Sequence, residues 1–364
     1  MHVPDGFIDA PVSLATGAVA AAAVAVALRG ARRELGGSPD GSGHGGERTA
    51  PLAGLVAAFV FAVQMLNFPV AAGTSGHLLG GALAAILVGP YTGMLCISVV
   101  LLMQSVLFAD GGLTALGVNV TDMAVVTTLV SYGLFRLLVT VLPRRRPSVT
   151  AAAFVAALVS VPAAAVAFTG LYALGGTTDV PLGKVFTAMV GVHVLIGVGE
   201  AVITALTVGA VIAVRPDLVY GARGLRRPLE LRTPDGTVTV PQAAPAPARS
   251  ARPVAVAGLV AALALAGFVS YYASTSPDGL EKVAHDKGLD SKEEEHAAKD
   301  SPLADYQVKD VGDERVSGGL AGVIGVGATL AAGTGVFVVV RKRRSRTAAT
   351  PAGTASAPAG NETL

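Results

Sequence analysis

The chain begins Met1-His2, so three nitrogen atoms that could bind a metal ion lie next to one another on one short piece of backbone. They are the terminal amine of Met1, the amide nitrogen of His2 and Nδ1 of the His2 imidazole. Closing them onto one ion would form two small chelate rings with almost no loss of loop entropy. Nitrogen donors suit Ni, Cu and related late divalent metals, and a square-planar nitrogen set indicates Ni(II) or Cu(II). A fourth nitrogen would complete the plane, and His77 is the candidate.

His77 ends a run rich in Pro, Gly and hydroxyl residues, 67–77, between two apolar segments. Irregular backbone at membrane depth is tolerated only inside protein or beside a cavity, and polar residues there are functional candidates. Taken singly, His2 could be a solvated terminal residue and His77 a buried histidine bonded to a carbonyl. On the same side of the membrane, the two together favour a metal site. Binding requires neutral imidazole, so we expect uptake to weaken as the pH falls through the histidine range.

Further polar residues lie in or beside the apolar segments. Any of Ser75, Gln104, Asn119 and Asp122 could hold a ligand ring or line the pocket, or could form interhelical hydrogen bonds. His193 and Glu200 lie seven residues apart on one predicted helix and so share a face. For this pair a packing or pore role and simple core burial both stay open.

Composition places the chain in a lipid bilayer. Of its 364 residues, 52% are hydrophobic and 14% are charged, with mean hydropathy +0.61, whereas a soluble domain is about a quarter charged. The net charge of +2 is too small to suggest nucleic acid. The single Cys96 forms no intrachain disulfide and no cysteine-based metal site. No basic region precedes the first apolar segment, as a signal peptide would require, so we expect Met1 to remain the terminus.

The apolar segments and basic loops together predict an all-α, polytopic membrane protein. The predicted spans are 11–28, 51–68, two short helices within 78–108, 117–142, 149–174, 185–214, 254–272 and 318–340. The positive-inside rule requires the break within 78–108, because an even number of crossings must separate two cytoplasmic loops. Gly89-Pro90 is the expected breaking point. The N-terminus then lies outside, and Met1, His2 and His77 meet on the outer face of the cell membrane.

Changes in composition divide the chain into four parts. Residues 1–220 are predicted to form a core of seven helices, and 221–253 to form a cytoplasmic linker rich in Pro, Ala and Arg. Residues 254–344 form a domain with two further transmembrane helices flanking an outer loop, and 345–364 are a tail expected to be disordered. In the outer loop, His285 and His296 with an acidic run could collect metal weakly, although a solvated helical face is the more ordinary interpretation. His44, in a loop rich in Gly and Ser, is expected to be solvated.

Four ordered motifs give the chain a specific resemblance. MHVPDGF at 1–7, QMLNFP at 64–69, GTSGHLLGG at 73–81 and FADGGL at 108–113 resemble the cobalt/nickel substrate-binding subunit (CbiM/NikM type) of energy-coupling-factor ABC transporters. The resemblance covers about residues 1–220. The sequence Pro277-Asp278-Gly279-Leu280-Glu281 resembles the PDGLE domain, here fused to that core. Val3 stands where Ile is usual in the family, which should be harmless.

The resemblance implies both a ligand set and partners. It implies that the terminal amine, the amide and imidazole of His2, and the imidazole of His77 bind the ion. It also implies a transmembrane coupling protein and paired ATP-binding subunits as partners. The imported cobalt would feed cobalamin synthesis, or the imported nickel would feed nickel enzymes.

Two functions from different classes are compatible with these ligands. The first is a capture subunit of an importer, with Co²⁺ or Ni²⁺ as cargo and no permanent cofactor. The second is a membrane-embedded, metal-dependent enzyme, which needs an open coordination position with a base beside it. No carboxylate is compellingly placed in the sequence, so the importer is favoured and no enzymatic activity is expected. The sequence has no G-x-x-x-x-G-K-[ST] phosphate loop, so another chain must hydrolyse any ATP. Cobalt and nickel are not distinguished.

Overall fold

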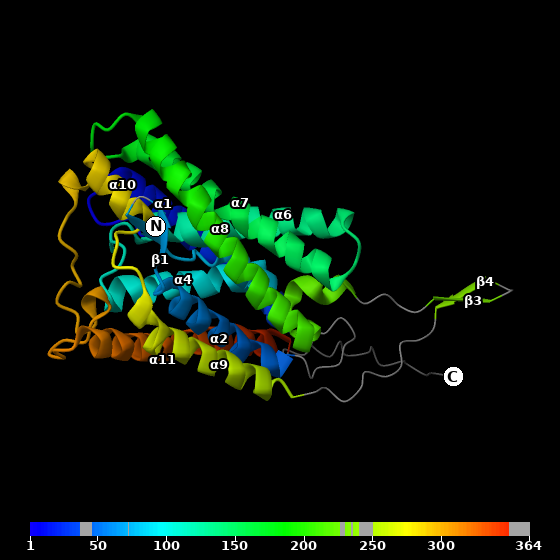
Figure 1. Ribbon diagram of the computed structural model, residues 1–364. Helices are drawn as coiled ribbons and strands as arrows, with labels where there is room; N and C mark the ends of the chain where they lie inside the picture. The colour runs from blue at the N-terminus through cyan, green and yellow to red at the C-terminus, as the bar shows by residue number, and fades with distance from the viewer. Residues whose placement is uncertain (37–45, 72, 226–229, 234–235, 240–249, 349–364) are drawn as a thin grey trace, which may run out of the picture.

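The computed structural model describes residues 1–36, 46–71, 73–225, 230–233, 236–239 and 250–348. In this part the chain is a helical bundle with two short hairpins (Figure 1). The α-helices are α1 (Ala10–Gly36), α2 (Gly46–Gln64), α3 (Gly81–Val88), α4 (Pro90–Leu107), α5 (Leu116–Asn119), α6 (Thr127–Val141), α7 (Arg146–Gly175), α8 (Leu182–Val214), α9 (Arg252–Gly267), α10 (Gly279–Lys287) and α11 (Glu314–Ala348). The hairpins pair β1 (Phe68–Ala71) with β2 (Thr74–Gly76) and β3 (Glu230–Thr233) with β4 (Gly236–Thr239), both antiparallel. A π-helix, Val120–Val126, joins α5 to α6, and short 3₁₀ turns follow α8, α9 and α10.

Seven helical segments in the described part are long and apolar enough to cross a membrane: Ala10–Leu35, Pro90–Leu107, Leu116–Val141, Arg146–Gly175, Leu182–Val214, Arg252–Tyr272 and Glu314–Arg341. The apolar part of α2, Ala50–Gln64, is shorter. With eight residues, α3 is about 12 Å long, against a hydrocarbon core of about 30 Å. The all-α, polytopic fold is therefore confirmed, whereas the number of complete crossings stays a prediction.

The predicted helix break within 78–108 is present. α3 ends at Val88, Gly89 has φ 105°, and Pro90 opens α4. Glycine tolerates this positive φ without the steric cost that a Cβ would bring. Proline at the first helical position loses no hydrogen bond, because its N–H would be unpaired there in any case.

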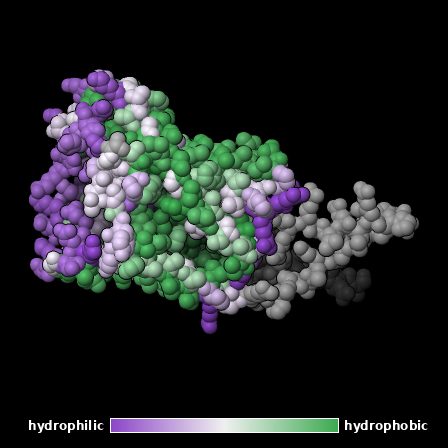
Figure 2. Space-filling view, in the orientation of Figure 1, coloured by the Kyte–Doolittle hydropathy of each residue, from purple (hydrophilic) through white to green (hydrophobic). Residues whose placement is uncertain are grey.

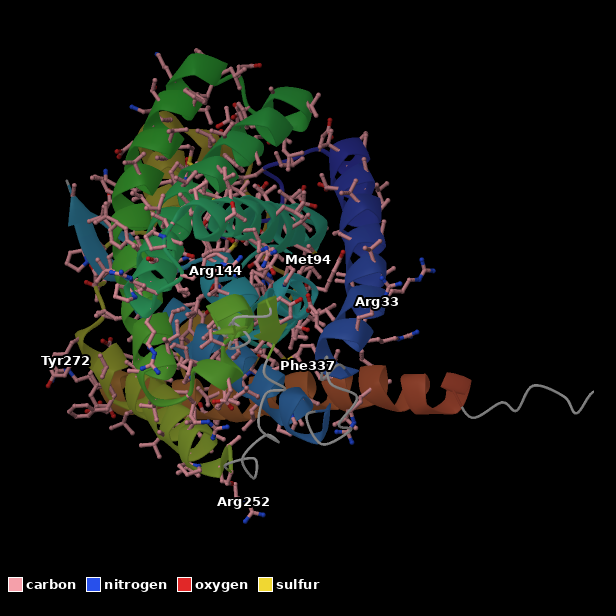
Figure 3. The ribbon with its side chains drawn as sticks, turned by 90° about the vertical axis from the view of Figure 1, so that its right-hand side faces the viewer. Arg33, Met94, Arg144, Arg252, Tyr272 and Phe337 are labelled. Carbon is pink, nitrogen blue, oxygen red and sulfur yellow. The ribbon has the colours of Figure 1, made fainter. Side chains whose placement is uncertain are left out.

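Polarity divides the molecule into an apolar belt between two hydrophilic ends (Figure 2). The N-terminus and α10 lie at one end (Figure 1). Arg33, Arg144 and Arg252 lie at the other end, which faces the viewer in Figure 3. This segregation follows the pattern from which the topology was predicted, and the placing of the N-terminal end outside the cell stays a prediction.

The helices that follow the predicted linker share one core with the helices before it. α9 and α11 pack on α2, and α11 also contacts α4. Gly54 permits the close approach of α11, because a Cβ at this position would lie 2.3 Å from the Thr334 hydroxyl oxygen. An aromatic cluster of Phe61, Phe108 and Tyr306 lies across this interface. The ring centroids of Phe61 and Phe108 are 5.1 Å apart, and those of Phe108 and Tyr306 are 4.8 Å apart.

Some predicted features fall beyond the described residues. They are residues 226–229, 234–235 and 240–249 of the predicted linker, the loop residue His44, and residues 349–364 of the predicted tail. α11 continues to Ala348, past the predicted boundary at 344.

Candidate metal centre

The N-terminal segment is built into the bundle. Met1 is 3% exposed and Val3 is fully buried. The Asn119 side chain holds the Val3 backbone on both sides, since its Oδ1 accepts from the Val3 N–H at 2.7 Å and its Nδ2 donates to the Val3 carbonyl at 3.1 Å. The Gly112 N–H also donates to that carbonyl, at 2.9 Å. The backbone of residues 1–3 therefore has a fixed position.

A turn at Pro4-Asp5-Gly6 redirects the chain into α1. The Asp5 carboxylate accepts from the backbone N–H groups of Leu113 (3.2 Å) and Thr114 (2.8 Å). Gly6 has φ 86°, and a Cβ there would lie 2.2 Å from the Lys292 carbonyl oxygen. Only glycine fits this turn without strain or displacement.

His77 leaves the β1–β2 hairpin on a short loop that α8 holds in place. The Glu200 carboxylate accepts from the backbone N–H groups of Leu79 at 2.7 Å and Gly80 at 3.1 Å. The Gln64 amide donates to the Leu79 carbonyl at 2.9 Å. Glu200 is fully buried, so these bonds explain a carboxylate inside the bundle. The open question on Glu200 is thus answered, because this side chain positions the loop that carries His77.

The central contact joins the first residue to His77. The Met1 amine lies 2.8 Å from His77 Nε2. His77 Nδ1 lies 3.0 Å from the Leu78 carbonyl oxygen, so Nδ1 carries the proton and the Nε2 lone pair faces the amine. Burial, and after it the positive amine, lower the pKa of His77. The His2 ring stacks on the His77 ring, with centroids 5.0 Å apart and planes 14° apart.

The His2 ring nitrogens each have a partner. Nδ1 lies 3.0 Å from an Asp110 carboxylate oxygen, and Nε2 lies 3.2 Å from Gln104 Oε1. Because Asp110 accepts a hydrogen bond from Nδ1–H, the Nε2 of a neutral His2 carries a lone pair and needs a donor. The Gln104 amide nitrogen, which is buried without a partner, becomes that donor when the amide is turned by 180°. The Tyr306 hydroxyl donates to Asp110 at 2.6 Å. Burial raises the pKa of Asp110, but His2 and Tyr306 outweigh burial and bring that pKa to about 2.

A second carboxylate, Asp278, reaches the centre from the N-terminus of α10. Its Oδ2 lies 2.8 Å from the Met1 amine and 3.4 Å from His77 Nε2. Burial raises the pKa of Asp278, but the amine and His77 outweigh burial and hold that pKa well below its usual range. One ligand atom each from His2, His77 and Asp278 lie within 4.8 Å of one another, and these residues form the only such group found in the described part of the chain. The expectation that no carboxylate is placed beside the nitrogens is therefore wrong.

The structure brings Met1, His2 and His77 together and separates the roles of the neighbouring polar residues. Gln104 contacts the His2 ring and Asn119 holds the backbone beside it. Ser75 instead bonds the segment before α10, through its hydroxyl to the Ser276 carbonyl (2.7 Å) and its N–H to the Pro277 carbonyl (2.8 Å).

The other histidines in the described part of the chain do not join this group. His193 is buried and its Nδ1 lies 2.7 Å from the Met189 carbonyl oxygen. The His285 side chain is 81% exposed, whereas His296 contacts the Gly111 carbonyl and the Ala298 N–H. His285 thus lies exposed on α10, as a solvated helical face implies, whereas His296 lies beyond that helix and is only partly exposed.

The fold and this centre define a multi-pass, α-helical membrane protein with a nitrogen-rich site at one end of its bundle. Residues 2–218 match the family model of the cobalt uptake substrate-specific transmembrane region, CbiM, and residues 252–342 match that of the PDGLE domain. The chain therefore belongs to the CbiM family and carries a PDGLE domain after the CbiM region.

Individual relatives agree with the family match. A putative metal transport protein of Haloquadratum walsbyi, HQ_3621A, is 40% identical over 220 residues, which cover 60% of this chain and 94% of that protein. A putative fused nickel transport protein NikMN of Archaeoglobus fulgidus is 39% identical over 221 residues, covering 60% of this chain and 68% of that protein. A crystal structure of a transition metal transporter is 29% identical with a TM-score of 0.49, covering 59% of this chain and 93% of that one.

Proposed function

We propose that this chain is the ion-capture subunit of an ATP-driven cobalt/nickel importer, and that it binds the ion through the Met1 amine, the His2 amide and imidazole, and His77. The observation that supports this most is the 2.8 Å separation of the Met1 amine from His77 Nε2, a pair 76 residues apart in sequence. Two donors at right angles, each about 2.0 Å from one ion, lie about 2.8 Å apart. The amine and His77 thus already have the spacing of neighbouring ligands.

Capture requires a local rearrangement of His2. Its Nδ1 faces Asp110, whereas the chelate with the terminal amine uses that same atom. The ring must leave Asp110 and give up its Nδ1 proton, and the amine and the His2 amide must each lose a proton, because metal ligands bind in their deprotonated form and these protons are released as the ion binds. Asp110 remains beside the site, held by the Tyr306 hydroxyl, and can again receive the ring when the ion leaves.

Transport requires partners that this chain does not supply. We infer a transmembrane coupling protein and ATP-binding subunits, since the sequence has no phosphate loop. The curated relatives named as metal and nickel transport proteins support this assignment. With the N-terminal end outside, the captured ion would enter from the outer face. Residues 1–220 would form the capture core, followed by the linker 221–253 and the PDGLE domain 254–344.

The enzyme alternative is weaker. The pKa of Asp110 is about 2 and that of Asp278 lies well below its usual range, so both carboxylates are weak bases at neutral pH. A general base works best when its pKa lies near the operating pH. The names of the relatives also describe transport.

Equilibrium binding of Co²⁺ and Ni²⁺ to the purified protein tests the proposal. We expect His77→Ala to abolish measurable binding of both ions, because it removes a ligand from a buried site. His285→Ala is the matched control, since that side chain is exposed, and it should bind both ions as the wild type does. Equal affinities of wild type and His77→Ala would refute the assignment.

A further inference from the structure

We propose that Asp278, a residue of the PDGLE domain, supplies an oxygen ligand to the ion that the N-terminal nitrogens and His77 capture. This inference rests on the proposed function and deepens it. It makes the fused domain part of the binding site, so that the site is complete only when α10 is docked on the CbiM region.

The two carboxylate oxygens of Asp278 have separate roles. Oδ1 caps α10 by accepting from the Glu281 N–H at 2.9 Å, and the Glu281 carboxylate accepts in return from the Asp278 N–H at 3.2 Å. Such a capping box fixes the side chain. Oδ2 is turned away from the helix and lies 2.8 Å from the Met1 amine. A cap needs one oxygen only, so the second is available for the site.

The distances allow Oδ2 to share an ion with the nitrogens. Two donors at about 2.0–2.1 Å from one ion can lie at most about 4 Å apart. Oδ2 lies 2.8 Å from the amine and 3.4 Å from His77 Nε2, and those two nitrogens lie 2.8 Å apart. All three separations fit a single ion without a change in the backbone.

Contacts on both sides hold Asp278 in this position. The Ser276 and Pro277 carbonyls accept from Ser75 in β2, and the Ser274 N–H donates to the Asn67 carbonyl at 2.7 Å. After Asp278, a Cβ on Gly279 would lie 2.8 Å from the Ile196 side chain in α8, so glycine permits the close docking of α10. Leu280 is 1% exposed and anchors the first turn in the core.

The charge and geometry of the ligand set also favour this role. A planar set of four nitrogens leaves the positions above and below the plane open. A carboxylate in one of them adds a negative charge that offsets part of the charge of the divalent ion in a buried site. A ligating carboxylate commonly has its other oxygen hydrogen-bonded, as Oδ1 is here.

The test uses Asp278→Ser and Glu281→Gln in the full-length protein. Serine caps a helix about as well as aspartate, so Asp278→Ser keeps the start of α10 and removes Oδ2. Glu281→Gln alters the same capping box and leaves Oδ2 in place. Co²⁺ affinity is measured by titration, and X-ray absorption of the bound Co²⁺ reports the number of nitrogen and oxygen neighbours.

We expect Asp278→Ser to weaken Co²⁺ binding at least about tenfold and to lose one light-atom neighbour, whereas Glu281→Gln matches the wild type. Asp278→Asn keeps the helix cap and the shape of the side chain, so it replaces the serine variant if that variant does not fold. It should also weaken Co²⁺ binding. Equal or tighter binding by the Asp278 variants, with unchanged coordination, would overturn the inference and make Asp278 a counter-ion of the amine. His77→Ala distinguishes a failure of this inference from a failure of the proposed function. If His77→Ala loses binding while the Asp278 variants keep it, only the inference fails and the proposed function stands.

Discussion

Replacing Asn119 with alanine should weaken metal binding although Asn119 touches no ligand nitrogen. Its side chain is 2% exposed and bonds both the N–H and the carbonyl of Val3. In Asn119→Ala the carbonyl keeps the Gly112 N–H at 2.9 Å, but the Val3 N–H loses its acceptor in a buried position. An unsatisfied buried donor costs about 1–3 kcal/mol. The metal-free variant avoids this cost when its N-terminus moves and the Val3 N–H meets water, whereas the metal-bound variant must bear it. At about 2 kcal/mol, with tenfold in affinity for every ~1.4 kcal/mol, the affinity for Ni²⁺ should fall about thirtyfold.

The assay is calorimetric titration of Ni²⁺ into the purified protein, together with thermal unfolding of each variant. Ser160→Ala is a suitable control, because Ser160 is also buried but bonds only the Ala157 carbonyl of its own helix. We expect this control to keep the wild-type affinity even if it unfolds at a lower temperature. An Asn119→Ala affinity within about twofold of the wild type would refute the reasoning that links the fixed position of Val3 to the chelate.

Three further predictions concern groups around the nitrogens. In the proposed site the ion binds neutral His77, and burial and then the amine lower the pKa of His77. Titrations across pH should therefore show affinity falling as the pH decreases, with His77 itself competing for protons only below the usual histidine range; affinity that rises on acidification would contradict this. Glu200→Ala leaves the two backbone N–H groups after His77 without their acceptor, so Ni²⁺ affinity should drop about tenfold or more; an unchanged dissociation constant would count against the positioning role. Tyr306→Phe removes one hydrogen bond from Asp110, worth about 1 kcal/mol, and should change the Ni²⁺ dissociation rate by less than about tenfold, measured by competition with a chelator; complete loss of binding would show that Tyr306 does more than hold Asp110.

The sequence predicted the helical, membrane-spanning fold because apolar length and basic loops are local signals. The break at Gly89-Pro90 was predictable for the same reason, since these residue types oppose a continuous helix wherever they lie. The π-helix Val120–Val126 was not predicted, because it depends on packing rather than on a residue pattern. The eight-residue length of α3 likewise left the number of complete crossings undecided.

The candidate site was predictable in its nitrogen atoms and not in its carboxylates. Met1 and His2 are adjacent, and His77 stands in an irregular segment, so local sequence marks all three. Asp278 is 277 residues from Met1, and in sequence it is simply a good N-cap residue followed three positions later by glutamate. Only the docking of α10 shows that one of its oxygens faces the amine. Asp110 was within a recognised motif, but its pairing with His2 Nδ1 depends on the folded path of the N-terminus.

The most direct test of the account is metal binding by protein that begins at Met1, compared with a variant carrying two added alanines before Met1 and with His2→Ala. A control carries the same two alanines at the other end of the chain. Co²⁺ and Ni²⁺ are titrated separately. Met1 is buried and its amine lies 2.8 Å from both His77 and Asp278, so we predict loss of binding in both variants and wild-type affinity in the control. Wild-type affinity in the variant extended before Met1 would contradict the terminal-amine chelate.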